Sequence, residues 1–306
     1  MTTERDDGSL VSIDGELVPT RDAKVSVFDH AFLYGDGIFE TFRVADGRVY
    51  RMGEHLDRLE RSARAIALDL PLPRPPLAEA ILRAIAANRL PDGFVKAIVS
   101  RGAGPEPLLE HAGLTSRLVV IVRPSMPFFK DGQGEQGLSA AIVGTRKTPA
   151  AALDPRIKSL NYLNVIKSRI EARDLGASES ILLDDRGRVV EASIYNVVAA
   201  RGRELLTPAE GCLQGITLDA TLALAEARGY RALRANLYPY DLESADELIF
   251  TSTAVGLLPV TGLNGRPVGD GRPGPVYAEL TAAYEADLRD PANGTAVPAA
   301  AEPARA

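Results

Sequence analysis

Apolar and polar residues alternate along the first fifty positions, and two Asp-Gly pairs interrupt the alternation. Asp14-Gly15 lies within LVSIDGELVP, and Asp46-Gly47 lies within IFETFRVADGRVYRM. Alternation with a period of two is typical of half-buried strands, and an Asp-Gly pair favours a two-residue hairpin turn. We therefore predict a hairpin at the first pair and a second hairpin that joins residues 38–44 to residues 49–52.

A helical period replaces the alternation after the second hairpin. In GEHLDRLERSARAIALDL, apolar residues recur every three or four positions, at Leu56, Leu59, Ala63 and Ile66, which predicts an amphipathic helix. The breaker PLPRPP ends this helix, and LAEAILRAIAANRL predicts another one. FVKAIVSRG and RLVVIVRP then have the composition of strands. Residues 1–124 are thus predicted to form a small α/β domain with a sheet and two helices.

A polar, glycine-bearing segment at 125–137 predicts an interdomain loop. The patterns after it predict, in order, a strand in LSAAIVG, a helix over 161–174, a hairpin in ESILLDDRGRVVEAS, a helix in GITLDATLALAEARG, a buried strand in DELIF and a helix in GPVYAELTAAYEADL. Residues 138–288 are therefore predicted to form a larger C-terminal domain. The low-complexity tail at 289–306 is predicted to be disordered. The expected fold class is a two-domain α+β or α/β protein.

The composition excludes several classes of protein. A net charge of −6 gives no sign of nucleic-acid binding. Cys212 is the single cysteine, so an internal disulfide is impossible, and one cysteine with three scattered histidines argues against a His/Cys metal site. The chain has no run of 18 apolar residues, and its first residues lack the pattern of a signal peptide. We expect a cytoplasmic enzyme or binding protein with neither nucleic-acid nor membrane partners.

Lysine is scarce in this chain, since six of its 35 basic residues are lysines. An arginine stays protonated, whereas a desolvated lysine loses its proton and becomes an amine nucleophile that forms Schiff bases. Lys158 lies in DPRIKSLNYL, between a proline and a predicted helix. Lys158 is therefore a candidate for covalent chemistry, although an arginine-rich composition also has a genomic explanation.

Six segments resemble, in their order and spacing, those of the class IV aminotransferases, the family with pyridoxal-phosphate fold type IV. They are FDHAFLYGDGIFETFRV, EHLDRL, IKSLNYLNVI, EASIYNVV, LQGIT and FTSTAVGLLPV. The family contains branched-chain aminotransferases, D-amino-acid transaminases and 4-amino-4-deoxychorismate lyases. The resemblance implies pyridoxal 5'-phosphate as the cofactor, a small N-terminal domain, a larger C-terminal domain and a homodimer.

The resemblance implies roles for three residues around the cofactor ring. Lys158 would form a Schiff base with the cofactor aldehyde and then carry a proton between the substrate α-carbon and the cofactor. Glu191 would face the pyridine nitrogen and keep it protonated. Tyr162 would donate a hydrogen bond to the ring phenolate oxygen. The ordinary alternatives are an exposed lysine, a solvated glutamate and a half-buried aromatic residue on a helix.

Three further segments match the phosphate site of the family. Arg58 in EHLDRL is the matching arginine, and a guanidinium fork suits a phosphate dianion. The helix that opens at Gly215, Ile216 and Thr217 has free N–H groups and a dipole that attract anions. Thr253 is a second matching threonine. The alternatives are an exposed helix arginine paired with a nearby glutamate, a helix-capping threonine and a turn threonine.

The substrate side of the site is indicated by YGDGIFETFR. Tyr34, Phe39, Thr41 and Arg43 lie in this segment. Alternation places the last three on one face of a strand, and the resemblance turns that face toward the active site. The alternative for Phe39 is packing in the core.

The ligand of the substrate carboxylate is the least defined part of the resemblance. The backbone around Thr253 and Ala254 would receive this carboxylate in the family. The Arg-x-His pair that serves D-amino-acid transaminases has no match in the RGAGPEP stretch that begins at Arg101. Arg43 and Arg101 are therefore the candidate side chains.

The implied activity is transfer of an amino group between an amino acid and a 2-oxo acid. The K-S-L-N run at Lys158 agrees with the D-amino-acid branch and gives a slight lean toward a D-amino-acid transaminase. A branched-chain L-amino-acid aminotransferase is the first alternative, although Thr41 replaces the glycine of its F-E-G-x-R motif. Thr41 favours the second alternative, a 4-amino-4-deoxychorismate lyase, which has a threonine at the corresponding place. A non-catalytic protein that binds the cofactor is the third.

Overall fold

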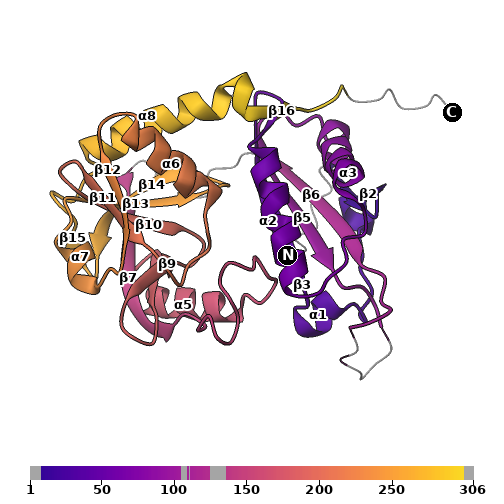
Figure 1. Cartoon of the computed structure of the whole chain (residues 1–306), viewed down its shortest axis with the longest axis horizontal. Coiled ribbons are helices and arrows are strands. Elements are labelled where there is room, and N and C mark those ends of the chain that lie inside the picture. The colour runs from indigo at the N-terminus through magenta and orange to yellow at the C-terminus, as the bar shows by residue number, and fades with distance from the viewer. Residues whose placement is uncertain (1–7, 105–108, 110, 125–135, 300–306) are drawn as a thin grey trace. The chain divides into compact units, whose positions relative to one another are not determined.

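The computed structural model describes residues 8–104, 109, 111–124 and 136–299. These residues form two compact units, each with its own sheet and its own core (Figure 1). The predicted interdomain loop at 125–137 lies almost wholly outside the described residues. Unit 1 consists of Met1–Met126, Ile157–Asn161 and Leu288–Ala306, and unit 2 consists of Pro127–Arg156 and Tyr162–Asp287.

Unit 1 contains an antiparallel sheet whose strands follow the order β16, β4, β3, β5, β6, β1 and β2. Both predicted hairpins are present, because Asp14-Gly15 joins β1 to β2 and Asp46-Gly47 joins β3 to β4. All four turn residues have positive φ angles, as the type I′ hairpin turn requires. The elements are β1 (Leu10–Ile13), β2 (Glu16–Pro19), α1 (His30–Tyr34), β3 (Gly37–Ala45), β4 (Arg48–Tyr50), α2 (Met52–Ala65), α3 (Arg74–Ala87), β5 (Gly93–Ser100), β6 (Arg117–Pro124) and β16 (Gly294–Ala296), with single 3₁₀ turns at Thr20–Asp22 and Pro291–Asn293.

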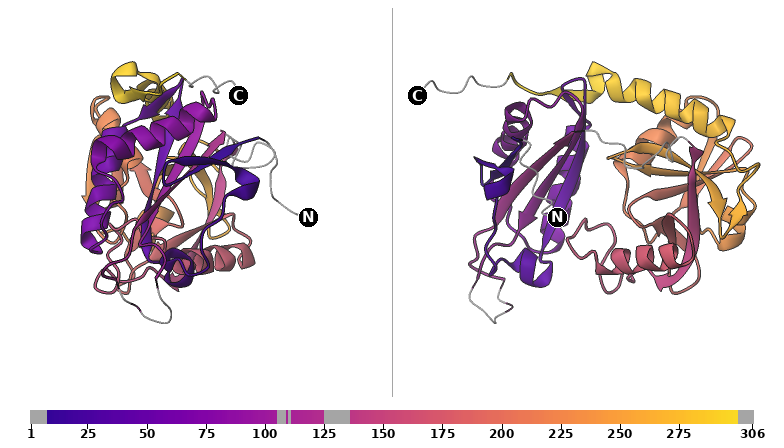
Figure 2. Two further views of the ribbon diagram at one scale, coloured as in Figure 1. Left: turned by 90° about the vertical axis from the view of Figure 1, so that its right-hand side faces the viewer. Right: turned by 180° about the vertical axis from the view of Figure 1, so that it is seen from behind.

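Helices α2 and α3 pack on the sheet of unit 1, in the purple part of Figures 1 and 2. Strand β3 shows how the two faces of this sheet differ. Ile38 and Phe42 belong to the apolar core with the two helices, whereas Phe39 and Thr41 point to the opposite face. The alternation predicted for this strand is therefore present, and it separates a packing face from a second face that carries polar groups.

Two distant pieces of chain complete unit 1. The segment Ile157–Asn161 runs beside β3, because the N–H of Phe39 donates to the carbonyl of Lys158 at 2.9 Å and the N–H of Leu160 donates to the carbonyl of Gly37 at 3.0 Å. Strand β16 pairs with β4. Local composition predicts disorder from residue 289, whereas residues 294–296 form this strand, because the edge of β4 offers backbone partners that the local sequence does not reveal.

Unit 2 contains a mixed sheet in the order β12, β11, β10, β13, β14, β7, β8 and β9, with β15 paired to β14. Strand β7 runs parallel to both of its neighbours. The local patterns do not predict β10, because it is buried on both faces and has no alternation. The elements are β7 (Leu138–Arg146), α5 (Leu163–Asp174), β8 (Glu179–Leu183), β9 (Val189–Ala192), β10 (Asn196–Arg201), β11 (Glu204–Pro208), α6 (Ile216–Glu226), β12 (Arg231–Ala235), α7 (Pro239–Glu243), β13 (Glu247–Ser252), β14 (Gly256–Leu263), β15 (Arg266–Pro267) and α8 (Pro275–Arg289).

Candidate functional site

The residues predicted for the site fall into two groups, one on each unit. Unit 1 carries Tyr34, Phe39, Thr41, Arg43, Arg58, Arg101 and Lys158. Unit 2 carries Tyr162, Glu191, Gly215, Ile216, Thr217, Thr253 and Ala254. The amine and the guanidinium groups thus belong to one unit, and the carboxylate and the helix N-terminus belong to the other.

Lys158 lies at the polar face of β3, beside Phe39. Its Nζ is 4.6 Å from the centroid of the Phe39 ring, and the Nζ of Lys96 on β5 is 4.2 Å from the same centroid. The backbone of Lys158 is held on both sides, since its carbonyl accepts from Phe39 and its N–H donates to the Oγ of Ser62 on α2 at 3.3 Å. Lys158 is only partly exposed and its Nζ lies against the Phe39 ring, which argues against the ordinary alternative of an exposed surface lysine.

Lys96 is an addition to the predicted set. It lies directly opposite Thr41 in the register of β5 and β3, while Arg43 lies opposite Phe94. Burial lowers the pKa of Lys96 from its usual 10.5. None of the ion pairs among the described residues involves its amine. This face of unit 1 therefore presents two amines and a hydroxyl around one aromatic ring, a combination suited to an anionic ligand with an apolar part.

Arg58 is buried between α2 and β3 instead of lying exposed on the helix. Its Nε donates to Oε1 of Glu40 at 2.6 Å and its Nη2 donates to Oε2 at 2.9 Å. The Nδ1 of His55 lies 2.8 Å from Oε2 of the same carboxylate. The ordinary alternative, a pair with Glu54, is wrong, because Glu54 pairs with Arg51 at 2.8 Å.

The charge state of this buried cluster follows from its contacts. Burial by itself would raise the pKa of Glu40, but the charge of Arg58 and the hydrogen bonds from Arg58 and His55 outweigh burial and hold this pKa well below its usual 4.5. Burial lowers the pKa of His55 below its usual 6.5, against the opposing effect of Glu40. At neutral pH the cluster therefore contains one anion, one cation and one neutral imidazole.

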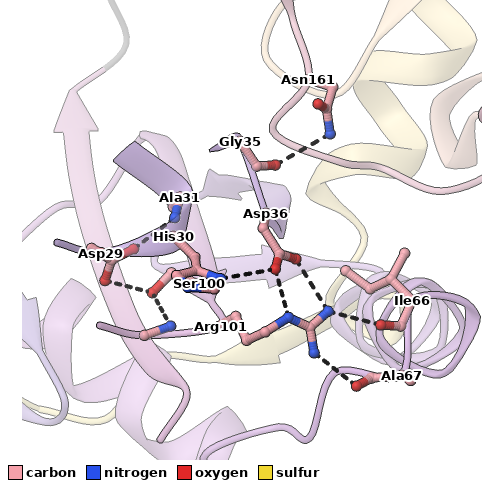
Figure 3. Close-up of polar contacts among 11 residues, drawn as sticks. Asp29, His30, Ala31, Gly35, Asp36, Ile66, Ala67, Ser100, Arg101 and Asn161 are labelled. Carbon is pink, nitrogen blue, oxygen red and sulfur yellow. Dashed lines mark hydrogen bonds and ion pairs between the residues drawn. The ribbon is translucent and has the colours of Figure 1, made fainter. Parts of the chain in front are cut away.

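Arg101 is tied into a structural cluster (Figure 3). Its Nε and Nη2 donate to the carboxylate of Asp36 at 2.6 and 3.1 Å. Its Nη1 donates to the carbonyl of Ala67 and its Nη2 to the carbonyl of Ile66, both at 2.8 Å. These four hydrogen bonds hold the guanidinium of Arg101 against Asp36, just before β3, and against the chain that follows α2. They weigh against the predicted role of Arg101 as the ligand of the substrate carboxylate.

Tyr34 is the last residue of α1 and is partly exposed. Its ring meets the ring of His30 edge-on, with centroids 5.0 Å apart. Gly35 ends the helix with a φ of 69°, a conformation that glycine adopts without strain. The Nδ2 of Asn161 donates to the carbonyl of Gly35 at 3.2 Å (Figure 3), so the segment that carries Lys158 is tied to the end of α1.

Glu191 lies on β9 of unit 2 and is buried. Its Oε1 forms an ion pair with the Nζ of Lys147, and its Oε2 accepts from the N–H of Leu213 at 3.0 Å. The alternative of a solvated glutamate is therefore wrong. Each oxygen of this carboxylate has a donor, so its position in the unit is fixed.

Helix α6 begins at Ile216, and Gly215 is its N-cap residue. A Cβ atom at position 215 would lie 1.9 Å from the Oδ1 of Asn196, so the close approach of the two chain segments requires glycine. Asn196 is itself fixed, since its Nδ2 donates to the carbonyl of Leu213 at 2.8 Å. Thr217 is the second residue of the helix, which rules out the alternative that it is the N-cap. The first turn of α6 thus has no N-cap side chain bonded to its N–H groups.

The remaining predicted residues of unit 2 lie at the ends of regular elements. Thr253 and Ala254 belong to the tight turn between β13 and β14, where Ser252 is paired with Gly256. Tyr162 is the N-cap residue of α5 and is half-buried.

A profile of the family Amino-transferase class IV matches residues 37–263. The chain belongs to this family. It is 36% identical over 281 residues to a protein of Methanocaldococcus jannaschii named "Putative branched-chain-amino-acid aminotransferase", covering 91% of this chain and 96% of the relative. It is 30% identical over 277 residues to the D-alanine aminotransferase of Bacillus licheniformis, covering 90% and 95%. The crystal structure of the Escherichia coli branched-chain amino acid aminotransferase superposes with a TM-score of 0.90 at 28% identity, covering 95% and 100%.

Membership in the class IV aminotransferases confirms the predicted two-domain fold, the transaminase class and pyridoxal 5'-phosphate as the cofactor. A structure of another branched-chain amino acid aminotransferase, with a TM-score of 0.89, contains pyridoxamine 5'-phosphate. The predicted lean toward D-amino acids is not confirmed by these relatives. Within the part of the chain that is described, no helix is both long and apolar enough to pass through a bilayer. The same residues contain no cluster of three or more His, Cys, Asp or Glu side chains suited to a metal ion.

The donor set of this class IV aminotransferase fits pyridoxal 5'-phosphate. Unit 1 offers the amine of Lys158 and the buried guanidinium of Arg58, and unit 2 offers a helix N-terminus and a fixed carboxylate; these groups match an aldehyde, a phosphate and a pyridinium nitrogen. Two buried hydroxyl oxygens, Ser193 Oγ and Thr251 Oγ1, have no hydrogen-bond partner among the described residues. In the sequence they lie two residues from Glu191 and from Thr253, and a buried hydroxyl without a protein partner can bond to a ligand.

Lys96 and Lys147 are the site residues that the sequence reasoning missed. Both are among the six lysines, and the scarcity that draws attention to Lys158 applies equally to them. Lys96 also interrupts the apolar run of β5, and Lys147 follows directly after β7. A search for lysines within a predicted strand or directly after one would have found both.

Proposed function

We propose that this aminotransferase acts on branched-chain L-amino acids and passes their amino group to a 2-oxo acid. The names of the Methanocaldococcus jannaschii relative and of the Escherichia coli structure support this substrate class. The hydrogen bonds of Arg101 weigh against the D-amino-acid alternative, because the arginine nearest in position to the carboxylate ligand of that branch is engaged elsewhere. The observation that carries the proposal is the position of the Lys158 amine beside the rings and amines of β3 and β5, with its Nζ and that of Lys96 against the ring of Phe39.

The chemistry at the reacting carbon is assigned to Lys158 and Glu191. When bound, pyridoxal 5'-phosphate supplies a ring that withdraws electrons from the substrate α-carbon. The Nζ of Lys158 binds the cofactor and then moves the proton of the α-carbon, and the bonds from Phe39 and Ser62 keep its backbone in place. The carboxylate of Glu191 holds a proton at the ring nitrogen. Lys147 orients that carboxylate.

Three kinds of donor are assigned to the phosphate. Arg58 supplies a charged donor, and the first turn of α6, with Gly215, Ile216 and Thr217, supplies backbone N–H groups. Thr253 adds a hydroxyl donor. The phenol of Tyr162 is assigned to the ring oxygen of the cofactor.

The substrate is assigned to the face of β3 and to the turn after β13. The backbone at Thr253 and Ala254 receives the α-carboxylate, and the ring of Phe39 packs against a branched apolar side chain. Lys96 and Arg43 attract the second carboxylate of a dicarboxylic co-substrate such as 2-oxoglutarate. One site thus takes an apolar amino acid in one half-reaction and a dianion in the other.

A substrate panel tests the proposal. The purified protein, loaded with the cofactor, is incubated with L-leucine, L-valine, L-isoleucine or D-alanine and 2-oxoglutarate, and the glutamate formed is measured. We expect turnover with the three L-amino acids and at most trace turnover with D-alanine. Turnover with D-alanine alone would overturn the substrate assignment and leave the family assignment intact.

A 4-amino-4-deoxychorismate lyase is the second candidate, because Thr41 shares the face of β3 with Phe39 and lies opposite Lys96. This reaction releases 4-aminobenzoate, which is fluorescent and easily measured. Release of 4-aminobenzoate at a rate above that of leucine transamination would favour the lyase. Thr41→Gly, which restores the glycine of branched-chain enzymes, is expected to keep leucine turnover within about tenfold.

A homodimer completes the proposal, and the cytoplasm remains the predicted location. Val27, Phe28 and Phe32 are large apolar side chains that are at least half exposed in and just before α1. Such a patch is typical of a subunit interface, and it would bring Tyr34 to the site of the neighbouring subunit. Light scattering of the wild type and of Phe32→Asp tests this proposal. We expect the wild type to be a dimer and Phe32→Asp to dissociate more readily. A monomeric wild type would contradict the proposal.

A further inference from the structure

The buried cluster of Glu40, His55 and Arg58 has more contacts than an ion pair needs. The Oε2 atom of Glu40 lies 2.9 Å from Arg58 Nη2, 2.8 Å from His55 Nδ1 and 3.2 Å from the N–H of Thr41. Oε1 accepts from Arg58 Nε at 2.6 Å. Glu40 is wholly buried, and His55 and Arg58 are nearly so.

Stability alone does not account for this cluster. Taking charged groups out of water costs several kcal/mol per ion, so a buried ion pair typically stabilises a fold no better than apolar side chains of the same size. The surroundings are apolar, since Phe42 packs against His55 and Leu59 adjoins Arg58 in the core. A charged cluster in an apolar core therefore indicates that the charged groups have a functional role.

The geometry of the fork defines the direction of Arg58. A guanidinium is planar, and the fork to Glu40 uses its Nε and Nη2. Nη1 is not part of the fork and therefore points away from Glu40 in the same plane. Loss of the Glu40 carboxylate would therefore release the guanidinium plane, and Nη1 with it, from this orientation.

Strand β3 connects this fork to Lys158. Glu40 follows Phe39 in the strand, and the N–H of Phe39 binds the carbonyl of Lys158 at 2.9 Å. Helix α2 repeats the link, because Ser62, one turn after Arg58, binds the N–H of Lys158 at 3.3 Å. Two neighbouring elements thus hold both the arginine and the lysine.

We propose that Glu40, supported by His55, is a positioning residue that aims Nη1 of Arg58 at the cofactor phosphate. Strand β3 then fixes the spacing between the phosphate donor and the amine of Lys158. This inference rests on the proposed role of Arg58 and adds that the affinity for the phosphate is set by a carboxylate that does not touch the cofactor.

Binding of two cofactor forms to the apoprotein tests this inference without any measurement of turnover. Pyridoxal 5'-phosphate and pyridoxal, which lacks the phosphate, are titrated into the wild type, Glu40→Gln and His55→Gln, and the dissociation constants are read from cofactor absorbance. Glu40→Gln is expected to weaken the binding of pyridoxal 5'-phosphate roughly tenfold or more, since a charged hydrogen bond to Arg58 is lost. The dissociation constant of pyridoxal is expected to change less than about twofold. His55→Gln is expected to act in the same direction with a smaller change.

Asp57→Asn is the matched control, because Asp57 also pairs with an arginine of the chain, Arg74, yet is exposed. It is expected to leave both dissociation constants unchanged. Circular dichroism and a thermal melt of each apoprotein report folding. If Glu40→Gln does not fold, His55→Gln decides the question.

The outcomes separate this inference from the proposed function. Equal weakening of both cofactor forms, or no weakening of either, by a folded Glu40 or His55 variant overturns the positioning role. Arg58→Lys tests the underlying assignment, because it keeps the charge and loses the planar fork. Unchanged phosphate affinity in Arg58→Lys and in Glu40→Gln would overturn both statements, whereas a loss in Arg58→Lys alone would overturn only the role of Glu40.

Discussion

The two units hold their buried charges in different ways. In unit 1, each buried guanidinium faces a carboxylate through two hydrogen bonds, as in the pairs of Arg58 with Glu40 and of Arg101 with Asp36. In unit 2, the carboxylate of Glu191 is held by one ammonium group and by one backbone N–H. The anion site predicted for unit 2 is also a backbone feature, the N-terminus of α6.

The difference teaches which kind of change each unit tolerates. Side-chain networks fail when an atom is removed, because the partner remains buried without its bond. Backbone sites survive the loss of side-chain atoms and fail when an added atom fills the space beside them. The predictions below test this distinction, beginning with the largest expected effect.

Lys158→Ala removes the amine that is proposed to bind the cofactor and to transfer the proton of the α-carbon. We expect transamination to fall by at least about 10³-fold, since both covalent attachment and proton transfer depend on this amine. The fold should persist, because the contacts that anchor position 158 come from its backbone. Initial rates with L-leucine and a thermal melt measure the two effects. Lys167→Met, at an exposed position of α5, is the matched control, and a comparable loss of rate in that variant would contradict the assignment.

Arg58→Met and Lys147→Met compare the two kinds of ion pair. Arg58→Met leaves the carboxylate of Glu40 wholly buried without its charged donor. His55 and the N–H of Thr41 are both on Oε2, and no donor among the described residues then remains on Oε1, so the free energy of unfolding is expected to drop by about 3–5 kcal/mol. Lys147→Met leaves Glu191 with its bond from Leu213, and about 1 kcal/mol is expected. Urea denaturation of the two apoproteins gives both values. Equal losses would show that the units do not differ in this respect.

Gly215→Ala tests the backbone site of unit 2. The new Cβ would meet the Oδ1 of Asn196 at 1.9 Å, so we expect a loss of about 1–3 kcal/mol together with weaker cofactor binding. Gly53→Ala in α2 is the control, because among the described residues outside its own helix turn a Cβ there would meet just the side chain of Arg74, at 3.9 Å. Helix propensity predicts that Gly53→Ala gains up to about 1 kcal/mol. A neutral Gly215→Ala would refute the steric argument.

Acid should weaken unit 1 through Glu40 and His55. Their pKa values lie below the usual 4.5 and 6.5 in the folded protein, so the unfolded chain binds more protons. The stability they contribute is therefore complete above about pH 6.5 and decreases as the pH falls below it. In His55→Gln we expect the free energy of unfolding to fall by about 1 kcal/mol less between pH 7 and pH 5 than it does in the wild type. Hydrogen exchange of peptides from β3 and α2 measures this, and a pH profile identical to that of the wild type would contradict it.

Local sequence was a good guide where structure depends on neighbours in the chain. The Asp14-Gly15 and Asp46-Gly47 hairpins and helix α2 were predictable because their turn chemistry and periodicity are local. Strand β10 was not, because burial on both faces removes alternation. The place of Ile157–Asn161 in unit 1 depends on hydrogen bonds to β3, more than a hundred residues earlier, which no local pattern encodes.

The candidate site shows the same limit. The lysine motif drew attention to Lys158, and alternation placed Phe39 and Thr41 on one face. The same reasoning also selected Arg101, whose partner Asp36 lies 65 residues earlier in the chain. A residue type in a motif indicates what chemistry is possible, but a pairing across the fold decides whether the group remains available for it.

Strand β16 has a consequence for the order in which the protein is made. Residues 294–296 close the edge of the unit 1 sheet at β4, whose residues leave the ribosome more than two hundred residues earlier. At usual elongation rates this interval lasts on the order of 10 seconds or more. During synthesis the nascent first unit therefore exposes an unprotected strand edge, and a C-terminal truncation before residue 294 would make that exposure permanent and promote edge-to-edge association.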